Sequence, residues 1–329
     1  MDNTYKERLA LRKSLLEEQR DIVVAVNDAG DPRVRAAVSE LYTWLLGTYL
    51  PGRYPSMFKL HHQAQLGMGK APLLENLVTT EVWPVVPGET DPTILALETL
   101  VKVVDEDFLI LLPEQKEKAA GHDAGEDAKY VLEAYSNCFP AGFNPREKLG
   151  LRLASIHGPV PHYSEKLERS MDRFFSKIEV GRYVRRFNWG ITTNTKLFAA
   201  FGGTHGSADE KEEPMKPGAL DVDRVRLPSL PLLRSKVDAV FPADLLSLSL
   251  SRQTLVRCER QTLHRLPRSK ALVFSFHTYT YPIQSIKDEG SGEDLAQAID
   301  GLKEGSAPQM HFYKRGAVWG EAVKAFLRS

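Results

Sequence analysis

The stretch from Leu255 to Tyr279 constrains the fold of this chain most strongly, because it predicts a long β-hairpin. Its two arms, Leu255 to Leu263 and Ala271 to Tyr279, flank the link Pro267-Arg268-Ser269-Lys270. The second arm, ALVFSFHTY, is rich in β-branched and aromatic residues, which favour strands, and the polar link with its proline favours a turn. Two strands joined by such a short link pair antiparallel. The sequence therefore predicts an antiparallel sheet.

Three other segments are expected to be strands. Phe108 to Leu112 is a compact apolar run that ends at Pro113. Tyr130 to Tyr135 is rich in residues that favour strands, and Tyr183 to Ile191 mixes aromatic residues with arginines, as a half-buried strand does.

Helices are expected around these strands, and several have recognisable start signals. Asp31 and Asp91 each precede a proline, which suits the first position of a helix. Asn144 and Glu147 form a capping box around Pro145. The apolar stripes expected along the helices are Val34, Val38, Leu41, Tyr42 and Leu45, ended by Gly47; Ile94, Leu97, Val101 and Val104; Leu149, Leu153 and Ile156; Leu167, Met171, Phe174, Phe175 and Ile178; Leu295, Ile299 and Leu302; and Val318, Ala322 and Phe326. The predicted class is α+β, with helices packed round a mainly antiparallel sheet.

Charge and cysteine content limit the functions open to the chain. Lysine plus arginine and aspartate plus glutamate number 43 each, so the net charge is zero and the basic excess of a nucleic-acid binder is missing. Cys138 and Cys258 are the only cysteines, too few for a disulfide framework or for a four-cysteine zinc or iron–sulfur site. A reducing compartment, the cytoplasm, is the expected location.

No targeting segment or membrane span is expected. Met1 to Asp21 alternates charged residues with leucines and has no apolar core of the signal-peptide type. No apolar run has the length needed to cross a bilayer. Two polar stretches, Glu114 to Lys129 and Gly202 to Val222, are expected to be surface loops, the second of them mobile.

His157 is the first candidate metal ligand. It ends an expected helix and is followed by Gly158, Pro159 and Pro161, which stop the helix and stiffen the chain beyond it. A rigid helix end of this kind suits a metal or haem ligand. The commoner interpretation is that His157 caps the last carbonyls and favours the negative end of the helix dipole. His162 follows five positions later, a spacing that matches no standard zinc pattern.

A second candidate group lies on the first arm of the hairpin. On a strand, Arg257 and Glu259 share one face, while Cys258 and Arg260 share the other. A carboxylate beside arginines is most often an ion-pair network on a sheet. The functional interpretation places Glu259 in a cavity as a proton donor or acceptor, its pKa set by burial and neighbours.

A third candidate group is Arg186, Asn188 and Trp189. Arg186 and Asn188 share one face of the expected strand, where the arginine could bind a carboxylate such as a haem propionate or could support the sheet. Gly202 and Gly203 lack the Lys-Ser/Thr pair of a phosphate loop, and no Gly-x-Gly-x-x-Gly follows a strand. No flavin, nicotinamide or nucleotide site is expected.

Three stretches, taken together, resemble a known family. They are FPAGFNPREKLGLRLASIHGPVPHY (139–163), RRFNWGI (185–191) and RCERQTLHRLPRSKALVFSFHTY (257–279), and LYTWLLGTYLPGRYPSMF (41–58) agrees with them. Their ordered combination is similar to the haem-dependent oxidative N-demethylase family, in its fungal-type, alpha-subunit-like form.

This resemblance implies a fold, a cofactor and a reaction. The fold would be PAS-like, an antiparallel sheet flanked by helices that holds haem b. The reaction would use dioxygen to remove a methyl group from a small amine, giving the amine and formaldehyde. Electrons would come from a separate flavin and iron–sulfur reductase, since no flavin or iron–sulfur cluster is expected in this chain.

The resemblance also implies roles for individual residues. His157 would be the axial iron ligand, with His162, His264 and His277 as open alternatives. Glu259 would handle protons beside the bound oxygen. The residues expected to line the site or to hold propionates are Arg186, Asn188, Trp189, Arg257 and Arg260.

The expected domain organisation is a haem-binding domain over residues 31–285 with helical extensions at 1–30 and 286–329. Two non-catalytic alternatives stay open. One is a haem-binding PAS-like sensor, and the other is an interaction protein without haem.

Overall fold

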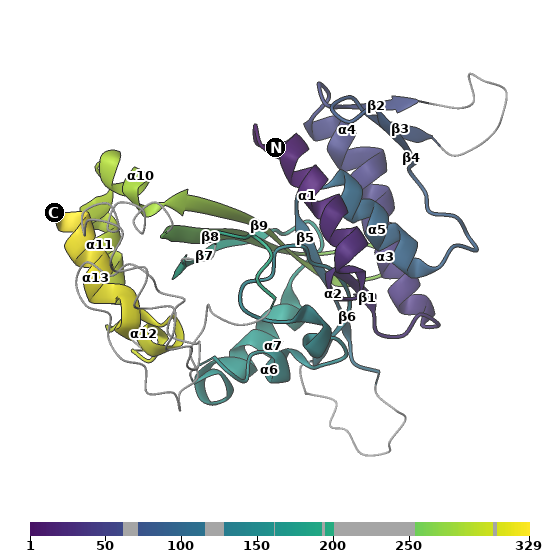
Figure 1. The fold of residues 1–329 in the computed structure, drawn as a ribbon. Helices are drawn as coiled ribbons and strands as arrows, with labels where there is room; N and C mark the ends of the chain where they lie inside the picture. The colour runs from purple at the N-terminus through teal and green to yellow at the C-terminus, as the bar shows by residue number, and fades with distance from the viewer. Residues whose placement is uncertain (62–71, 116–127, 161, 193–194, 201–253, 305–307) are drawn as a thin grey trace, which may run out of the picture.

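The computed structural model describes residues 1–61, 72–115, 128–160, 162–192, 195–200, 254–304 and 308–329 (Figure 1). The chain is α+β, as predicted, and its strands form two antiparallel sheets. The expected Gly202–Val222 loop lies outside the described residues, and so does most of the Glu114–Lys129 loop.

The larger sheet has six strands in the order β1-β6-β5-β9-β8-β7, and the smaller sheet has three in the order β2-β3-β4. The strands are β1 (Val24–Val26), β2 (Phe58–His61), β3 (Leu73–Asn76), β4 (Glu81–Pro84), β5 (Asp107–Pro113), β6 (Tyr130–Ser136), β7 (Val184–Thr192), β8 (Leu255–Arg265) and β9 (Leu272–Pro282). The strands predicted from sequence are confirmed as β5, β6, β7 and the β8–β9 hairpin. The short strand β1 and the smaller sheet were not predicted.

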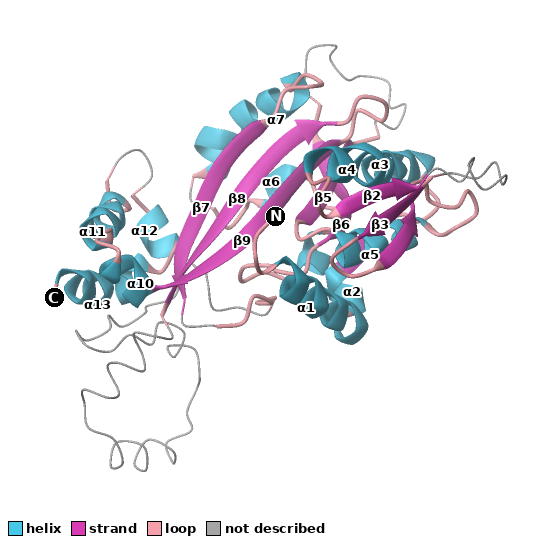
Figure 2. Cartoon of the chain, turned by 90° about the horizontal axis from the view of Figure 1, so that it is seen from above, coloured by secondary structure: helices cyan, strands magenta, loops and turns pink. Residues whose placement is uncertain are grey.

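The helices lie on both faces of the larger sheet and at its far end (Figures 1 and 2). They are α1 (Tyr5–Glu18), α2 (Arg20–Val23), α3 (Pro32–Trp44), η1 (Leu45–Tyr49), α4 (Leu50–Arg53), α5 (Thr93–Val103), η3 (Pro145–Lys148), α6 (Leu153–Ile156), η4 (Tyr163–Leu167), α7 (Glu168–Lys177), α10 (Ile283–Asp288), α11 (Gly292–Gly301), α12 (Met310–Tyr313) and α13 (Gly316–Arg328). In the described part of the chain, no helix combines the length and the apolar character needed to cross a membrane.

Two helix predictions were wrong in detail. Gly47 does not end the helix that begins at Pro32, because a π-helical turn, η1, leads directly into α4. Leu46 and Leu50 are fully buried on either side of Gly47, so packing in the core outweighs the low helix propensity of glycine.

The second correction concerns the helix expected over residues 144–156. Asn144 does cap its first turn, but that turn is the short η3 alone. Gly150 adopts a left-handed backbone, with φ of +76°, and its N–H donates to the carbonyl of Leu132 on β6 (2.8 Å). The chain therefore leaves the helix to bond with the sheet, and α6 begins afresh at Leu153.

Strand alternation gives β7, β8 and β9 two faces, the pocket face and the core face. The pocket face carries Arg186 and Asn188 on β7, with Arg257, Glu259 and Gln261 opposite them on β8. The core face carries Cys258, Arg260 and His264 on β8 and His277 on β9.

Different helices cover the two faces. Leu153 of α6 and Phe175 of α7 pack with Leu263 on the pocket face. On the core face, Val273 of β9 belongs to the main core, which α1, α3 and α5 complete. At the far end of the strands, α10, α11 and α13 pack against β7 and β8 around Trp319. The part of the pocket face next to these last helices holds the site.

Candidate active site

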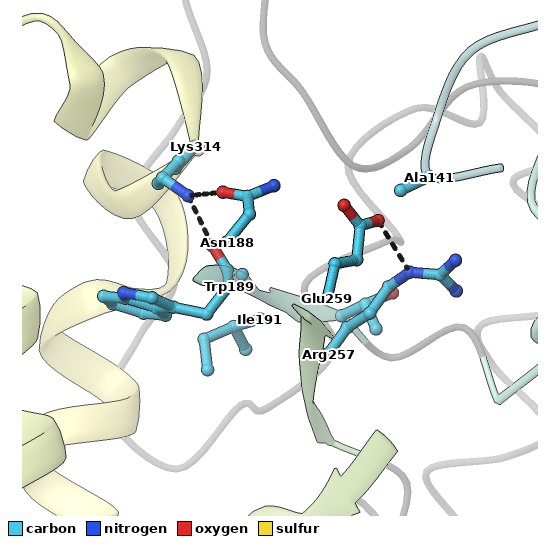
Figure 3. Close-up of a pocket in the computed structure, with 9 residues that line it drawn as sticks. Ala141, Asn188, Trp189, Ile191, Arg257, Glu259 and Lys314 are labelled. Carbon is cyan, nitrogen blue, oxygen red and sulfur yellow. Dashed lines mark hydrogen bonds and ion pairs between the residues drawn. The ribbon is translucent and has the colours of Figure 1, made fainter. Parts of the chain in front are cut away.

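A hollow opens on the pocket face where β7 and β8 meet the turn before α13 (Figure 3). The space in it that a water-sized sphere can occupy is about 30 Å³, room for about two water molecules, and the hollow is partly open to solvent. The residues that line it are Ala141, Asn188, Trp189, Gly190, Ile191, Thr192, Arg257, Glu259 and Lys314.

Gly190 lines the hollow and has no side chain to fill it. It lies on β7 directly across from Arg257. A Cβ built at Gly190 would meet no atom of the described residues within 4 Å. A larger residue here would therefore fill the hollow without a backbone clash.

Glu259 is the buried carboxylate of the site, with 8% of its surface exposed. Gln261 donates from Nε2 to its Oε2 (2.9 Å), and Arg186 donates from Nε to Gln261 Oε1 (2.5 Å). Arg257 Nε lies 3.9 Å from Glu259 Oε1. Four side chains thus form a continuous polar row on the pocket face, as Arg186–Gln261–Glu259–Arg257.

The protein backbone fixes Arg257 firmly. Its guanidinium donates to the carbonyls of Leu197 (3.0 Å) and Phe139 (2.7 Å). The N–H of Phe139 donates in turn to Asp107 Oδ2 (2.8 Å), and Asp107 pairs with the fully buried Arg12 (2.7 Å). Nε of Arg257 is buried without a hydrogen-bond partner among the described residues. It is therefore the guanidinium atom that can still interact with Glu259 or with a ligand in the hollow.

Lys314 enters the hollow from the turn between α12 and α13. Its Nζ donates to Asn188 Oδ1 (2.9 Å) and to the Trp189 carbonyl, and it lies 5.4 Å from the centroid of the Trp189 ring. Burial lowers the pKa of Lys314 to about 8, although the charge of Glu259 opposes that shift. Trp319 holds the turn by donating from Nε1 to the Lys314 carbonyl (3.0 Å).

His157 ends α6, as predicted, on the helix that packs against the pocket face. Its Nδ1 lies 2.9 Å from the Leu153 carbonyl. Because a carbonyl only accepts, Nδ1 carries the proton in this bond and Nε2 keeps its lone pair. The ring stacks on Tyr163 at 4.8 Å, and burial, with a smaller contribution from the charge of Arg186, lowers the pKa of His157. The residue is therefore a neutral imidazole with an available Nε2.

The other histidines named from sequence lie elsewhere. His264 and His277 are on the core face, where His264 packs beside Trp44. His277 Nδ1 lies 2.6 Å from the Asp105 carbonyl, so that ring is held on the far side of the sheet from Glu259. His162 Nδ1 bonds with Glu165 at 3.0 Å. Within the described ranges, no three His, Cys, Asp or Glu side chains gather where a metal ion could be held.

The structure brings most of the sequence candidates together, but not all of them. Arg186, Asn188, Arg257 and Glu259 share the pocket face. Arg260 points to the core face, where it pairs with Glu106 (2.7 Å). Trp189 lines the hollow with its backbone, while its ring packs toward the C-terminal helices.

Sequence analysis missed Lys314 and the open floor at Gly190. Lys314 reaches a partner 125 positions away, and no motif in its neighbourhood links it to β7. Gly190 has a weak signal, since an isolated glycine inside a strand often marks a close approach of a ligand or of another backbone.

The described residues thus place a hollow, a buried carboxylate and a neutral histidine on one face of an antiparallel sheet in an α+β protein. The family comparison gives the more specific assignment. Residues 1–324 match the model for haem-dependent oxidative N-demethylase, alpha subunit-like, so the chain belongs to this family. The family name indicates haem dependence and oxidoreductase chemistry.

Proposed function

We propose that this protein holds haem b on the pocket face and uses it to demethylate a small N-methylated amine with dioxygen. Family membership supports the cofactor and the reaction class. The observation that carries the proposal to this site is the placement of two groups on one side of the sheet. His157 offers a neutral imidazole with a free nitrogen, and Glu259 offers a buried carboxylate.

The residues present fit a haem. A histidine whose Nδ1 donates to a backbone carbonyl is oriented to ligate iron through Nε2, which is the state of His157. Arg186 and Arg257 supply cationic donors suited to carboxylates such as propionates. The bare floor at Gly190 leaves room beside them.

The PAS-like character of the fold belongs to the same proposal. The six-stranded antiparallel sheet with helices on both faces supports it.

Bound haem would supply activation of dioxygen, so that an N-methyl carbon can be oxidised and lost as formaldehyde. Glu259 would hold or deliver a proton at Oε1, since its Oε2 already accepts from Gln261. Arg257 would keep that carboxylate turned toward the hollow. The chain would depend on a separate flavin and iron–sulfur reductase for electrons.

The first experiment is an absorption spectrum of protein expressed with added haem precursor, compared with His157→Ala. We expect a strong Soret band that weakens or shifts in this variant, because the residue that would hold the iron is removed. His264→Ala and His277→Ala are matched controls on the core face and should leave the band in place. Absence of a Soret band in the unmodified protein would overturn the proposal. A band changed only by a control variant would show that the control histidine, and not His157, is the iron ligand.

Turnover is tested separately with a competent reductase, by assaying formaldehyde from small N-methylated amines. A haem-loaded protein that forms no formaldehyde from any of them would instead be a sensor.

A further inference from the structure

Lys314 is a buried lysine that forms no direct ion pair among the described residues, although the charge of Glu259 acts on it. An ammonium group has three N–H donors, and Nζ uses two of them on neutral acceptors, Asn188 Oδ1 and the Trp189 carbonyl. Within the part of the chain that the structure describes, no carboxylate forms an ion pair with it. Burying a charge under these conditions is unfavourable unless an anion joins it, and this cost explains why the pKa of Lys314 falls to about 8.

The charges around the hollow point to a ligand that brings its own anion. Arg186, Arg257 and Lys314 are positive, whereas Glu259 is the one negative group among these four. A small N-methylated amine is itself positive near neutral pH. Such a cation would bring no anion to Lys314, and Glu259 already interacts with Arg257 and Gln261.

The positions of these groups suit a ligand with two opposite charges. Figure 3 shows Lys314 and Asn188 on one side of the hollow and Glu259 with Arg257 on the other. Gly190 lies across from Arg257, and a Cβ there would meet no atom of the described residues within 4 Å. A carboxylate at the Lys314 side and an ammonium at the Glu259 side would each meet an opposite charge.

We propose that the substrate of this site is a small N-methylated amino acid whose carboxylate binds Lys314 Nζ and whose amine lies toward Glu259. This inference rests on the proposed function and narrows its substrate class from amines in general to zwitterions. Lys314 is then a specificity-determining residue, and Asn188 holds its ammonium group in place.

The test is isothermal titration calorimetry at pH 7 of the haem-loaded protein with N-methylglycine and with its amide, N-methylglycinamide. At this pH both ligands carry a methylated ammonium, and a neutral amide replaces the carboxylate in the second. We expect N-methylglycine to bind about 10- to 100-fold more tightly, the range typical of a hydrogen bond between charged groups. Equal affinities would overturn the proposal.

Three variants locate this preference. Lys314→Met keeps the length of the side chain and should abolish the preference by weakening N-methylglycine alone. Lys314→Arg should retain most of it. Gly190→Leu fills the floor and should weaken both ligands. A preference that survives Lys314→Met, or binding of both ligands that survives Gly190→Leu, would show that the carboxylate binds elsewhere.

The pH dependence gives a second signature. The affinity for N-methylglycine should be constant below about pH 7 and fall above about pH 8, as Lys314 loses its proton, until the contribution of the carboxylate is lost. The other groups that act on Lys314 are Glu259, Arg186 and Cys258. Burial raises the pKa of Cys258 above its usual value. An affinity for N-methylglycine that is unchanged from pH 7 to 9 would contradict the assignment.

The two proposals fail in different ways. Calorimetry needs neither oxygen nor electrons, so it reports on Lys314 even where no turnover occurs. If haem does not bind at all, the proposed function fails, whereas the same titration of haem-free protein still tests carboxylate preference. If Lys314→Met loses its Soret band and the ligand preference is unchanged, Lys314 serves a propionate and the substrate proposal is wrong.

Discussion

Each face of β8 carries an arginine, and the two arginines have different surroundings. On the core face, Arg260 pairs with Glu106. On the pocket face, Arg257 sits against backbone carbonyls and leaves Nε without a hydrogen bond among the described residues, 3.9 Å from Glu259. The two arginines are three positions apart on one strand, so residue type alone does not separate structural from functional groups.

Both faces have buried polar atoms without a hydrogen-bond partner among the described residues, His264 Nε2 and His277 Nε2 on the core face and Arg257 Nε on the pocket face, but only that of the pocket face borders the hollow. Most buried polar groups in folded proteins are hydrogen-bonded, so an incomplete set needs an explanation. On the pocket face, Glu259 Oε1, Arg257 Nε and one N–H of Lys314 all border the same hollow with bonding capacity left over. A ligand would complete them, and the following variants test this interpretation.

The largest expected effect comes from exchanging a carboxylate on each face. Glu259→Gln should keep haem but lower turnover by about 10²- to 10⁴-fold, the usual contribution of a general acid or base. Glu106→Gln, its control on the core face, removes the partner of Arg260 and should leave turnover unchanged. The measurements are the Soret band and the rate of formaldehyde release with a competent reductase.

Either of two outcomes would contradict the functional difference between the two faces. Normal turnover by Glu259→Gln would make this carboxylate structural. A loss of turnover in Glu106→Gln that matches the loss in Glu259→Gln would mean that the effect does not depend on the face.

The division of the candidate residues between the two faces of β8 could be predicted from strand alternation in the sequence. It placed Arg257 and Glu259 on one face and Cys258 and Arg260 on the other, and the register of β8 confirms this division. Sequence could not say which face holds the site, because that depends on where α6 and the C-terminal helices pack. Arg260 was therefore grouped with the candidates although it lies on the opposite face.

Contacts between distant segments account for what sequence missed. Lys314 meets Asn188 only because α12 and α13 fold back on the far end of the sheet. Local signals located most elements well, yet they failed at Gly47 and Gly150. At Gly47, core packing overrides local preference, and at Gly150 a backbone bond to β6 does so.

A histidine on the core face gives the next effect in size. Burial lowers the pKa of His264 to about 4, from 6.5 in an unfolded chain. Between these values the unfolded chain binds a proton that the folded protein does not, so stability falls as the pH drops from 6.5 to 4. The shift corresponds to about 3 kcal/mol.

His264→Phe should keep the ring contacts with Trp44 and Tyr183 and lose this acid sensitivity. The measurement is the free energy of unfolding by urea at pH 7, 5.5 and 4, for the variant and the unmodified protein. Parallel pH profiles for the two proteins would show that His264 titrates normally and is not held neutral by burial.

The smallest expected effect is the most direct test of the difference between the two faces, because it compares the two arginines of one strand. Arg260→Met removes a partly exposed ion pair with Glu106, and such pairs contribute about 0–1 kcal/mol. We therefore expect a change in unfolding free energy below about 1 kcal/mol and an unchanged Soret band. Arg257→Met removes a buried guanidinium that binds two backbone carbonyls, so it should cost more stability and reduce turnover. If Arg260→Met instead reduced haem content as much as Arg257→Met did, the core face would also take part in holding the cofactor, and the assignment of the site to one face of β8 would be wrong.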